Sequence, residues 1–166
     1  FSLREAIGLA NTVALPTRIT FAPSLGGGGH FTILLTLGEL AITRSIGIEG
    51  PGRDLLTIDA SGNDPTLNLG DGSRVFNISD GLSNNMLDVS LGGMLLTRGD
   101  SGGDGGAILN HEQLTLTDCN INSNFSTANG GGVANLGVLE VVRSEIGANT
   151  AQLDGGGIYT VSGSLT

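Results

Sequence analysis

Apolar and polar residues alternate in short runs along most of the chain. In residues 114–117 leucine alternates with threonine, and comparable runs are separated by Gly, Asn, Asp and Ser. Period-two alternation bounded by turn-forming residues predicts short, half-buried strands joined by turns. Earlier runs of this kind are found at residues 19–21, 40–42, 46–48, 56–58 and 75–78.

One segment has a helical pattern instead. At the start of the chain, Ser2 and Glu5 have the spacing of a capping box, in which each side chain bonds the other's backbone N–H. Leu3, Ile7 and Ala10 would then share one face. We therefore expect a short amphipathic helix here, placed where it covers the open end of whatever the strands build.

A repeat of 25 residues organises the second half of the sequence. Glycine-rich strings that end in Ile or Val occur at residues 105–108, 130–133 and 155–158, and the apolar positions downstream keep nearly the same offset. We count two or three short strands in each copy. Such a unit cannot bury its own apolar face, so successive copies must stack strand upon strand.

The architecture that stacks such copies is a parallel β-helix, an all-β solenoid whose coils rise by about 4.8 Å each. Residues one repeat apart then lie above one another. The predicted interior columns are Leu91, Leu116 and Val141, and Ile108, Val133 and Ile158.

This interpretation divides a single β-helix segment into three parts. Residues 1–12 form the capping helix, residues 13–81 form irregular coils, and residues 82–166 form regular 25-residue coils. The last strand pattern has no capping segment after it, so we expect the segment to be truncated at this end. Further coils of the same chain are the expected partner there.

Composition and charge exclude several partners. The chain has 29 glycines, 14% charged residues and a net charge of −9 without a single lysine. This charge repels phosphate backbones and anionic headgroups, so nucleic acid is not an expected partner. Apolar runs are too short for a membrane helix, and we expect no direct membrane insertion of this segment. Cys119 is the only cysteine and is expected to be a small buried core residue.

Candidate sites are few. Residues 99–103 (Gly-Asp-Ser-Gly-Gly) spell the string around the nucleophile of chymotrypsin-like proteases, but they lie inside the repeat, and we interpret them as a turn. Asp100 and Asp104 lie on that turn, and their oxygens could hold calcium; the alternative is that both are solvated turn residues. No catalytic or other cofactor-binding residue is predicted.

Stacking also predicts structural contacts between coils. Asp118 and Arg143 are one repeat apart and should form an exposed ion pair. The pairs Asn110 with Asn135 and Asn124 with Asn149 should bond from coil to coil. Asp104 and its equivalents Asn129 and Asp154 precede the glycines, where we expect a left-handed backbone.

The opening residues resemble a known motif. Residues 2–7, followed by Ala10 and Asn11, are similar to the N-terminal Cys-Ser-Leu-Arg-Glu-Ala-Ile motif of bacterial cell-surface and secreted β-helix repeat proteins, with Phe1 in place of the cysteine. The glycine strings distantly resemble those of chlamydial polymorphic outer-membrane proteins, whose companion Phe-x-x-Asn motif is not evident here.

The resemblance implies a right-handed helix, export to the cell surface and a structural or adhesive passenger role. Carbohydrate or a host or cell-surface protein is the implied partner. The competing function is that of a carbohydrate-active β-helix enzyme, a polysaccharide lyase or glycosidase, which needs converging carboxylates. An ice-binding surface is excluded because Thr115 is followed one repeat later by Glu140, which breaks a threonine ladder.

Overall fold

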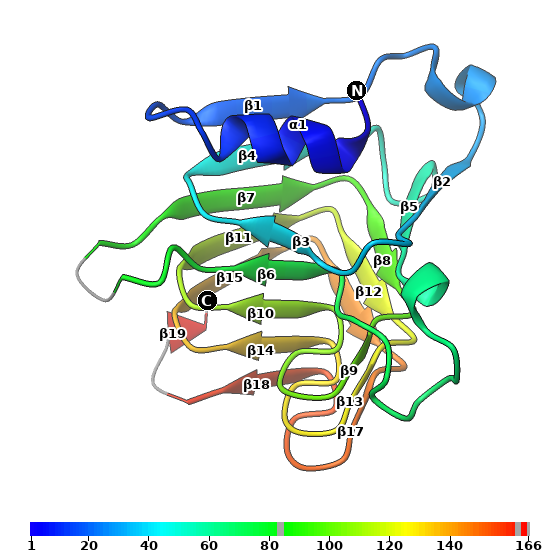
Figure 1. The fold of residues 1–166 in the computed structure, drawn as a ribbon, viewed down its shortest axis with the longest axis vertical. Coiled ribbons are helices and arrows are strands. Elements are labelled where there is room, and N and C mark those ends of the chain that lie inside the picture. Colours follow the sequence, from blue (N-terminus) through cyan, green and yellow to red (C-terminus); the bar gives the residue numbers. More distant parts are fainter. Residues whose placement is uncertain (83–84, 162–163, 166) are drawn as a thin grey trace.

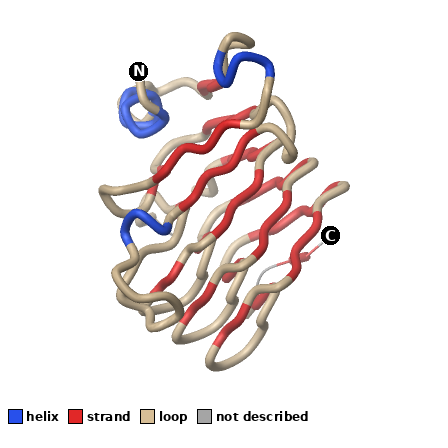
Figure 2. The backbone as a smooth tube through the Cα atoms, turned by 90° about the vertical axis from the view of Figure 1, so that its right-hand side faces the viewer, coloured by secondary structure: helices blue, strands red, loops and turns tan. Residues whose placement is uncertain are grey.

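The chain forms a right-handed parallel β-solenoid. The computed structural model describes residues 1–82, 85–161 and 164–165. The coils descend from the N-terminal helix at the top of Figure 1 to β18 at the bottom, and Figure 2 shows strands of successive coils lying side by side along one wall. The predicted fold class is confirmed.

Three parallel sheets form the long walls and a small fourth sheet closes each regular coil. Sheet A contains β1 (Thr17–Thr20), β4 (Ile46–Glu49), β7 (Asp88–Gly92), β11 (Gln113–Thr117), β15 (Val138–Val142) and β19 (Ser164–Leu165). Sheet B contains β2 (Phe31–Leu34), β5 (Leu56–Asp59), β8 (Leu95–Thr97), β12 (Asn120–Asn122) and β16 (Glu145–Gly147). Sheet C contains β3 (Leu40–Ile42), β6 (Phe76–Ile78), β10 (Ile108–Asn110), β14 (Val133–Asn135) and β18 (Ile158–Thr160). Sheet D contains β9 (Asp100–Ser101), β13 (Phe125–Ser126) and β17 (Thr150–Ala151).

The regular coils follow the predicted register. Leu116 pairs with Leu91 on one side and with Val141 on the other, and Val133 pairs with both Ile108 and Ile158. Side chains that alternate inward form one continuous apolar core, to which each fully buried Leu or Ile contributes about 1.5 to 3 kcal/mol. Each complete regular coil has four strands rather than two or three, because the two-residue strands of sheet D are too short to be seen in an alternation pattern.

The glycine strings allow the coil backbones to approach closely. Gly105, Gly130 and Gly155 all have positive φ, between 68° and 74°. A Cβ on Gly106 would overlap the carbonyl of Gly131 in the next coil. The left-handed residue is thus the glycine itself, and the expectation that the polar residue before it shares this conformation is wrong. Those polar residues instead bond from coil to coil, Asn129 donating to Asp104 Oδ1 over 3.0 Å.

Both predicted asparagine ladders are present. Asn110 donates to Asn135 Oδ1 over 2.7 Å, and Asn124 donates to Asn149 Oδ1 over 2.9 Å. Asn110, Asn124 and Asn135 are buried. Their amides also bond backbone groups at the bends, so they satisfy polar atoms that would otherwise be unpaired inside the solenoid.

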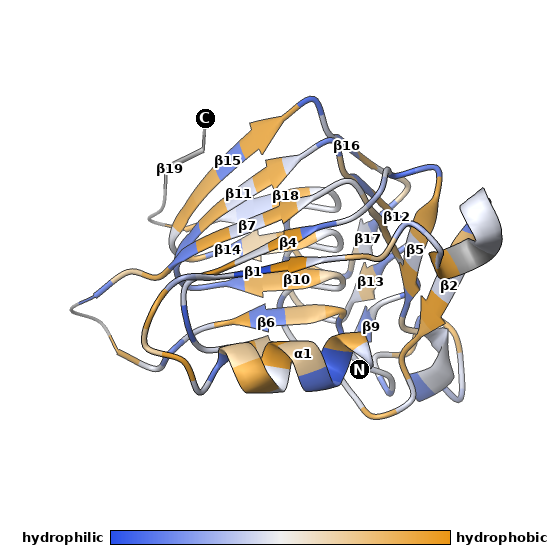
Figure 3. Ribbon diagram, turned by 90° about the horizontal axis from the view of Figure 1, so that it is seen from above, coloured by the Kyte–Doolittle hydropathy of each residue, from blue (hydrophilic) through white to orange (hydrophobic). Residues whose placement is uncertain are grey.

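The N-terminal helix caps the first coil as predicted. Helix α1 (Leu3–Ala10) begins at the capping box of Ser2 and Glu5 and buries Leu3, Ile7 and Ala10. It packs on β3, the uppermost strand of sheet C, and in Figure 3, the view from above, it runs along the sheet C side of the stack. Arg4 donates to the carbonyls of Gly38 and Glu39, and Asn11 donates to that of Ala41. The helix therefore bonds to an edge that would otherwise have no strand beside it.

Insertions make the earlier coils irregular, and two of them lie between β5 and β7. A loop that contains the 3₁₀ helix η2 (Ser61–Asn63) separates β5 from β6, and a second loop separates β6 from β7. Ile46 therefore pairs with Val89 rather than with a residue 25 positions on. A further 3₁₀ helix, η1 (Leu25–Gly28), lies between β1 and β2. In the last coil Leu139 pairs with Leu165, as a one-residue insertion in the preceding turn predicts; residues 162–163 of that turn lie outside the described residues.

Candidate functional site

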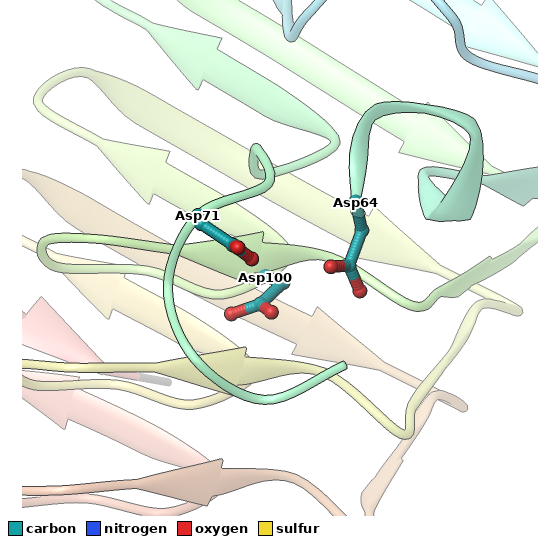
Figure 4. Close-up of side chains that lie close together, drawn as sticks. All are labelled: Asp64, Asp71 and Asp100. Atoms are coloured by element: carbon teal, nitrogen blue, oxygen red, sulfur yellow. The ribbon is translucent and has the colours of Figure 1, made fainter. Parts of the chain in front are cut away.

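Three carboxylates meet beside sheet D. Asp100 lies on β9, while Asp64 and Asp71 come from the loop between η2 and β6, and one oxygen from each lies within 4.8 Å of the others. Figure 4 shows the three side chains converging where this loop passes over β9. Carboxylate oxygens are the ligands that a hard cation such as calcium prefers, so these are residues that could hold one.

Asp100 already has partners within the protein. It is 2% exposed, and its two oxygens accept the backbone N–H groups of Gly70 and Leu69 over 2.7 and 3.1 Å. The backbone N–H of Asp100 donates to Ser73, so the loop pairs with the edge of β9 much as another strand would. The expectation of a solvated turn residue is wrong for Asp100, because this loop covers it.

The cluster changes the ionisation of Asp64. Burial raises the pKa of the Asp64 carboxyl, and the negative charges of Asp100 and Asp71 add to this effect, while the backbone N–H of Thr66 opposes it. Asp64 and Asp71 have no counterpart in the repeat because they lie in an insertion. Only their position among Gly, Asn and Pro, which indicates a turn, could have singled them out.

Asp104 does not belong to this carboxylate group. Its Oδ1 accepts both the backbone and the side-chain N–H of Asn129, at 2.9 and 3.0 Å. Its backbone carbonyl accepts a bond from Arg74, which also reaches Ser101 Oγ and forms an ion pair with Glu39. The structure thus does not bring together the two calcium candidates of the sequence in one cluster; Asp104 serves the contact between coils.

The protease-like string forms a strand and the bend after it. Ser101 Oγ is buried and accepts the guanidinium of Arg74 over 2.9 Å and the backbone N–H of Gly103 over 3.2 Å. His30 bonds Thr57 on β5, and His111 lies exposed after β10. Among the described residues, neither histidine forms a hydrogen bond with Ser101. The Ser101 hydroxyl accepts from Arg74, and no general base contacts it in the described part of the chain.

Two further predictions are confirmed. Cys119 is fully buried, and burial raises the pKa of its thiol to about 11. Asp118 and Arg143 form a two-pronged ion pair on the surface, with N–O distances of 2.8 and 2.9 Å. The hydrogen bonds from Arg143 lower the pKa of the Asp118 carboxyl.

Two grooves lie on the outside of the solenoid. One, of about 560 Å³, is cut into the outer side of sheet A around Gly92 and is bordered by Glu49 and Asp118. Another, of about 510 Å³, lies between His111 and the loop that joins β6 to β7. Sequence reasoning missed both, since each is formed by residues whose pairing depends on the insertions.

Searches of protein-family models, of curated proteins and of solved structures find no match to this chain. Within the described residues, no helix combines the length and apolar character needed to cross a membrane.

Proposed function

We propose that this chain is a non-catalytic structural or adhesive module of an exported bacterial surface protein, a rigid rod that presents polar side chains to carbohydrate or to a host or cell-surface protein. One observation carries this proposal. The interior column Leu91, Leu116 and Val141 keeps its apolar character from coil to coil, while the outward column beside it changes from Ser90 to Thr115 to Glu140. Such a solenoid keeps its shape while its surface varies.

The proposed place in a longer protein is supported by the lower end of the stack. The apolar residues Val141, Ile146 and Ile158 are only half-buried, whereas their equivalents one coil earlier, Leu116, Ile121 and Val133, are fully buried. A further coil of the same kind would complete their burial and pair with β16, β17 and β18, each of which is the last strand of its sheet among the described residues. Further coils of the same chain are therefore the partner we propose for this end.

The second candidate is a carbohydrate-active enzyme. It is favoured by the groove on sheet A, which has a carboxylate on either side, Glu49 and Asp118. Each of these carboxylates forms an ion pair with an arginine, Arg18 and Arg143 respectively. The hydrogen bonds from Arg143 lower the pKa of the Asp118 carboxyl, whereas a general acid needs a raised pKa, so this carboxylate suits binding better than proton transfer.

A turnover assay separates the two functions. The purified chain is incubated with a panel of neutral and acidic polysaccharides, and reducing ends and unsaturated products are measured. The proposal expects no product above that of a Leu116→Asp variant, and it expects beads coated with the folded chain to adhere to cell surfaces. Release of product that depends on Glu49 or Asp118 would refute a non-catalytic role. Antibody labelling of intact producing cells tests the proposed export.

A further inference from the structure

The groove on sheet A exists because one outward position of the ladder has no side chain. Outward side chains on successive strands line up in a column that contains Thr20, Glu49, Gly92, Thr117 and Val142. Gly92 interrupts this column between Glu49 and Thr117. The surface is therefore recessed at β7, with Glu49 above the recess and Thr117 below it.

The wall at the end of the strands is rigid. The turn after β4 bonds the next coil at two places, Gly50 to the carbonyl of Gly92 over 2.8 Å and Gly52 to that of Gly93 over 3.0 Å. A Cβ on Gly50 would overlap the Gly93 carbonyl, so the two backbones touch without any side chain between them. A groove with such a wall needs little ordering when a ligand enters, which favours binding.

Polar groups surround the recess. Arg18 pairs with Glu49 and Arg143 pairs with Asp118, and both exposed carboxylates retain lone pairs that can accept further hydrogen bonds. Ser90 and Thr117 add hydroxyl groups to the lining. Arg53, next to the wall, donates to the carbonyl of Arg143 over 3.4 Å and keeps other N–H groups free to donate.

These groups fit a ligand rich in hydroxyl groups. Carboxylates accept hydrogen bonds from sugar hydroxyls, and hydroxyl and guanidinium groups donate back to them. The net charge of −9 disfavours uronates and phosphates, and the two carboxylates in the lining are already balanced by Arg18 and Arg143, so a neutral sugar is the class of ligand that we expect. A volume of about 560 Å³ lies within the usual range of ligand sites.

We propose that the groove around Gly92 on the outer face of sheet A binds a neutral glycan. The proposal rests on the adhesive role proposed above and names its ligand class and its site. Glu49 and Asp118 accept hydroxyl protons, and Ser90 and Thr117 complete the contacts. The recess at Gly92 provides the room for a sugar ring.

The test is a titration of the isotopically labelled chain with cellohexaose and maltohexaose at millimolar concentrations, followed by amide NMR shifts. We expect shifts confined to Ser90, Gly92, Thr117, Asp118 and their neighbours for at least one of the two sugars. Gly92→Val fills the recess. Its φ is not left-handed, and its Cβ would lie 3.4 Å from the nearest atom, the carbonyl of Thr117, so the fold accepts the change. Affinity should fall by roughly tenfold or more.

Gly147→Val is the matched control. Gly147 lies on β16 in sheet B, and a Cβ there has nothing within 4 Å. This variant should bind as the parent does. The proposal is overturned by equal binding in Gly92→Val, by shifts that map elsewhere, by no shifts with either sugar, or by stronger binding of oligogalacturonate. The shift map of the parent chain tests the site even where Gly92→Val is less stable. If coated beads adhere to cells but no glycan changes the amide NMR shifts, the proposed adhesive function is retained and only the proposed binding site is refuted.

Discussion

Replacing Leu116 by Asp tests the central geometric feature of the molecule, the inward column of sheet A. Leu116 is fully buried between Leu91 above and Val141 below. Truncation of a buried leucine to alanine costs about 2 to 5 kcal/mol. Aspartate adds an unpaired charge in the core, which costs several kcal/mol more. The sum is comparable to the whole stability of an ordinary domain, about 5 to 15 kcal/mol, so we expect Leu116→Asp to unfold the chain.

The control is the neighbouring residue on the same strand. Thr115 points outward, and its hydroxyl lies 3.5 Å from the carboxylate of Glu140. Thr115→Asp therefore sets two like charges opposite each other and should cost only about 0.2 to 1 kcal/mol. Far-UV circular dichroism during a urea titration measures both variants, with Leu116→Ala as an intermediate that stays folded. Similar losses at positions 115 and 116 would refute the inward and outward assignment.

Three further predictions concern polar groups. Asn124→Ala removes a buried amide that accepts from Gly99 and donates to Leu96, and should cost about 2 to 3 kcal/mol in urea unfolding, whereas Asn122→Ala should change little. Arg143→Gln should lower the melting temperature at neutral pH. The folded state lowers the pKa of Asp118, so the ion pair stabilises the fold fully above pH 3.8, and this stabilisation is lost as the pH falls through the pKa of the folded state. A difference in melting temperature between Arg143→Gln and the parent that persists in acid or in high salt would contradict the ion pair. Asp64→Asn should raise the melting temperature at neutral pH, because it removes a carboxylate whose charged form is disfavoured by burial and by the charges of Asp100 and Asp71. The pKa of Asp64 is raised in the folded state, so the destabilisation by its charge disappears below pH 3.8, where the carboxyl is protonated in both states. If Asp64→Asn raised the melting temperature equally at that low pH, its effect would not come from the charge.

The regular coils could be predicted in detail because their neighbours are set by a constant offset. Once 25 residues is taken as one turn, the partners of Ile108, Leu116 and Cys119 follow from counting. The same offset predicted the asparagine ladders and the ion pair between Asp118 and Arg143. Each of these contacts joins residues whose separation no insertion changes.

The acidic cluster could not be predicted because it joins a repeat position to an insertion. Asp100 lies on β9 at a position where the next coils have Phe125 and Thr150, and the pattern alone places it on an open turn. The loop that contains Asp64 and Asp71 folds back over β9, and its path depends on bonds such as Gly70 to Asp100. A periodic signal carries no information about a segment that occurs once.

The proposed binding surface also depends on the insertions, so it could not be found from the sequence. Gly92 fits the repeat as an ordinary strand position, one coil before Thr117. It becomes the floor of a recess only because Glu49 pairs above it, and that pairing spans both insertions. Inward residues must stay apolar because they pack in the core between neighbouring coils, while outward residues contact only solvent, neighbouring side chains or a ligand. A chain of this kind can therefore change its ligand by changing a few outward residues, and insertions decide which of those residues become neighbours.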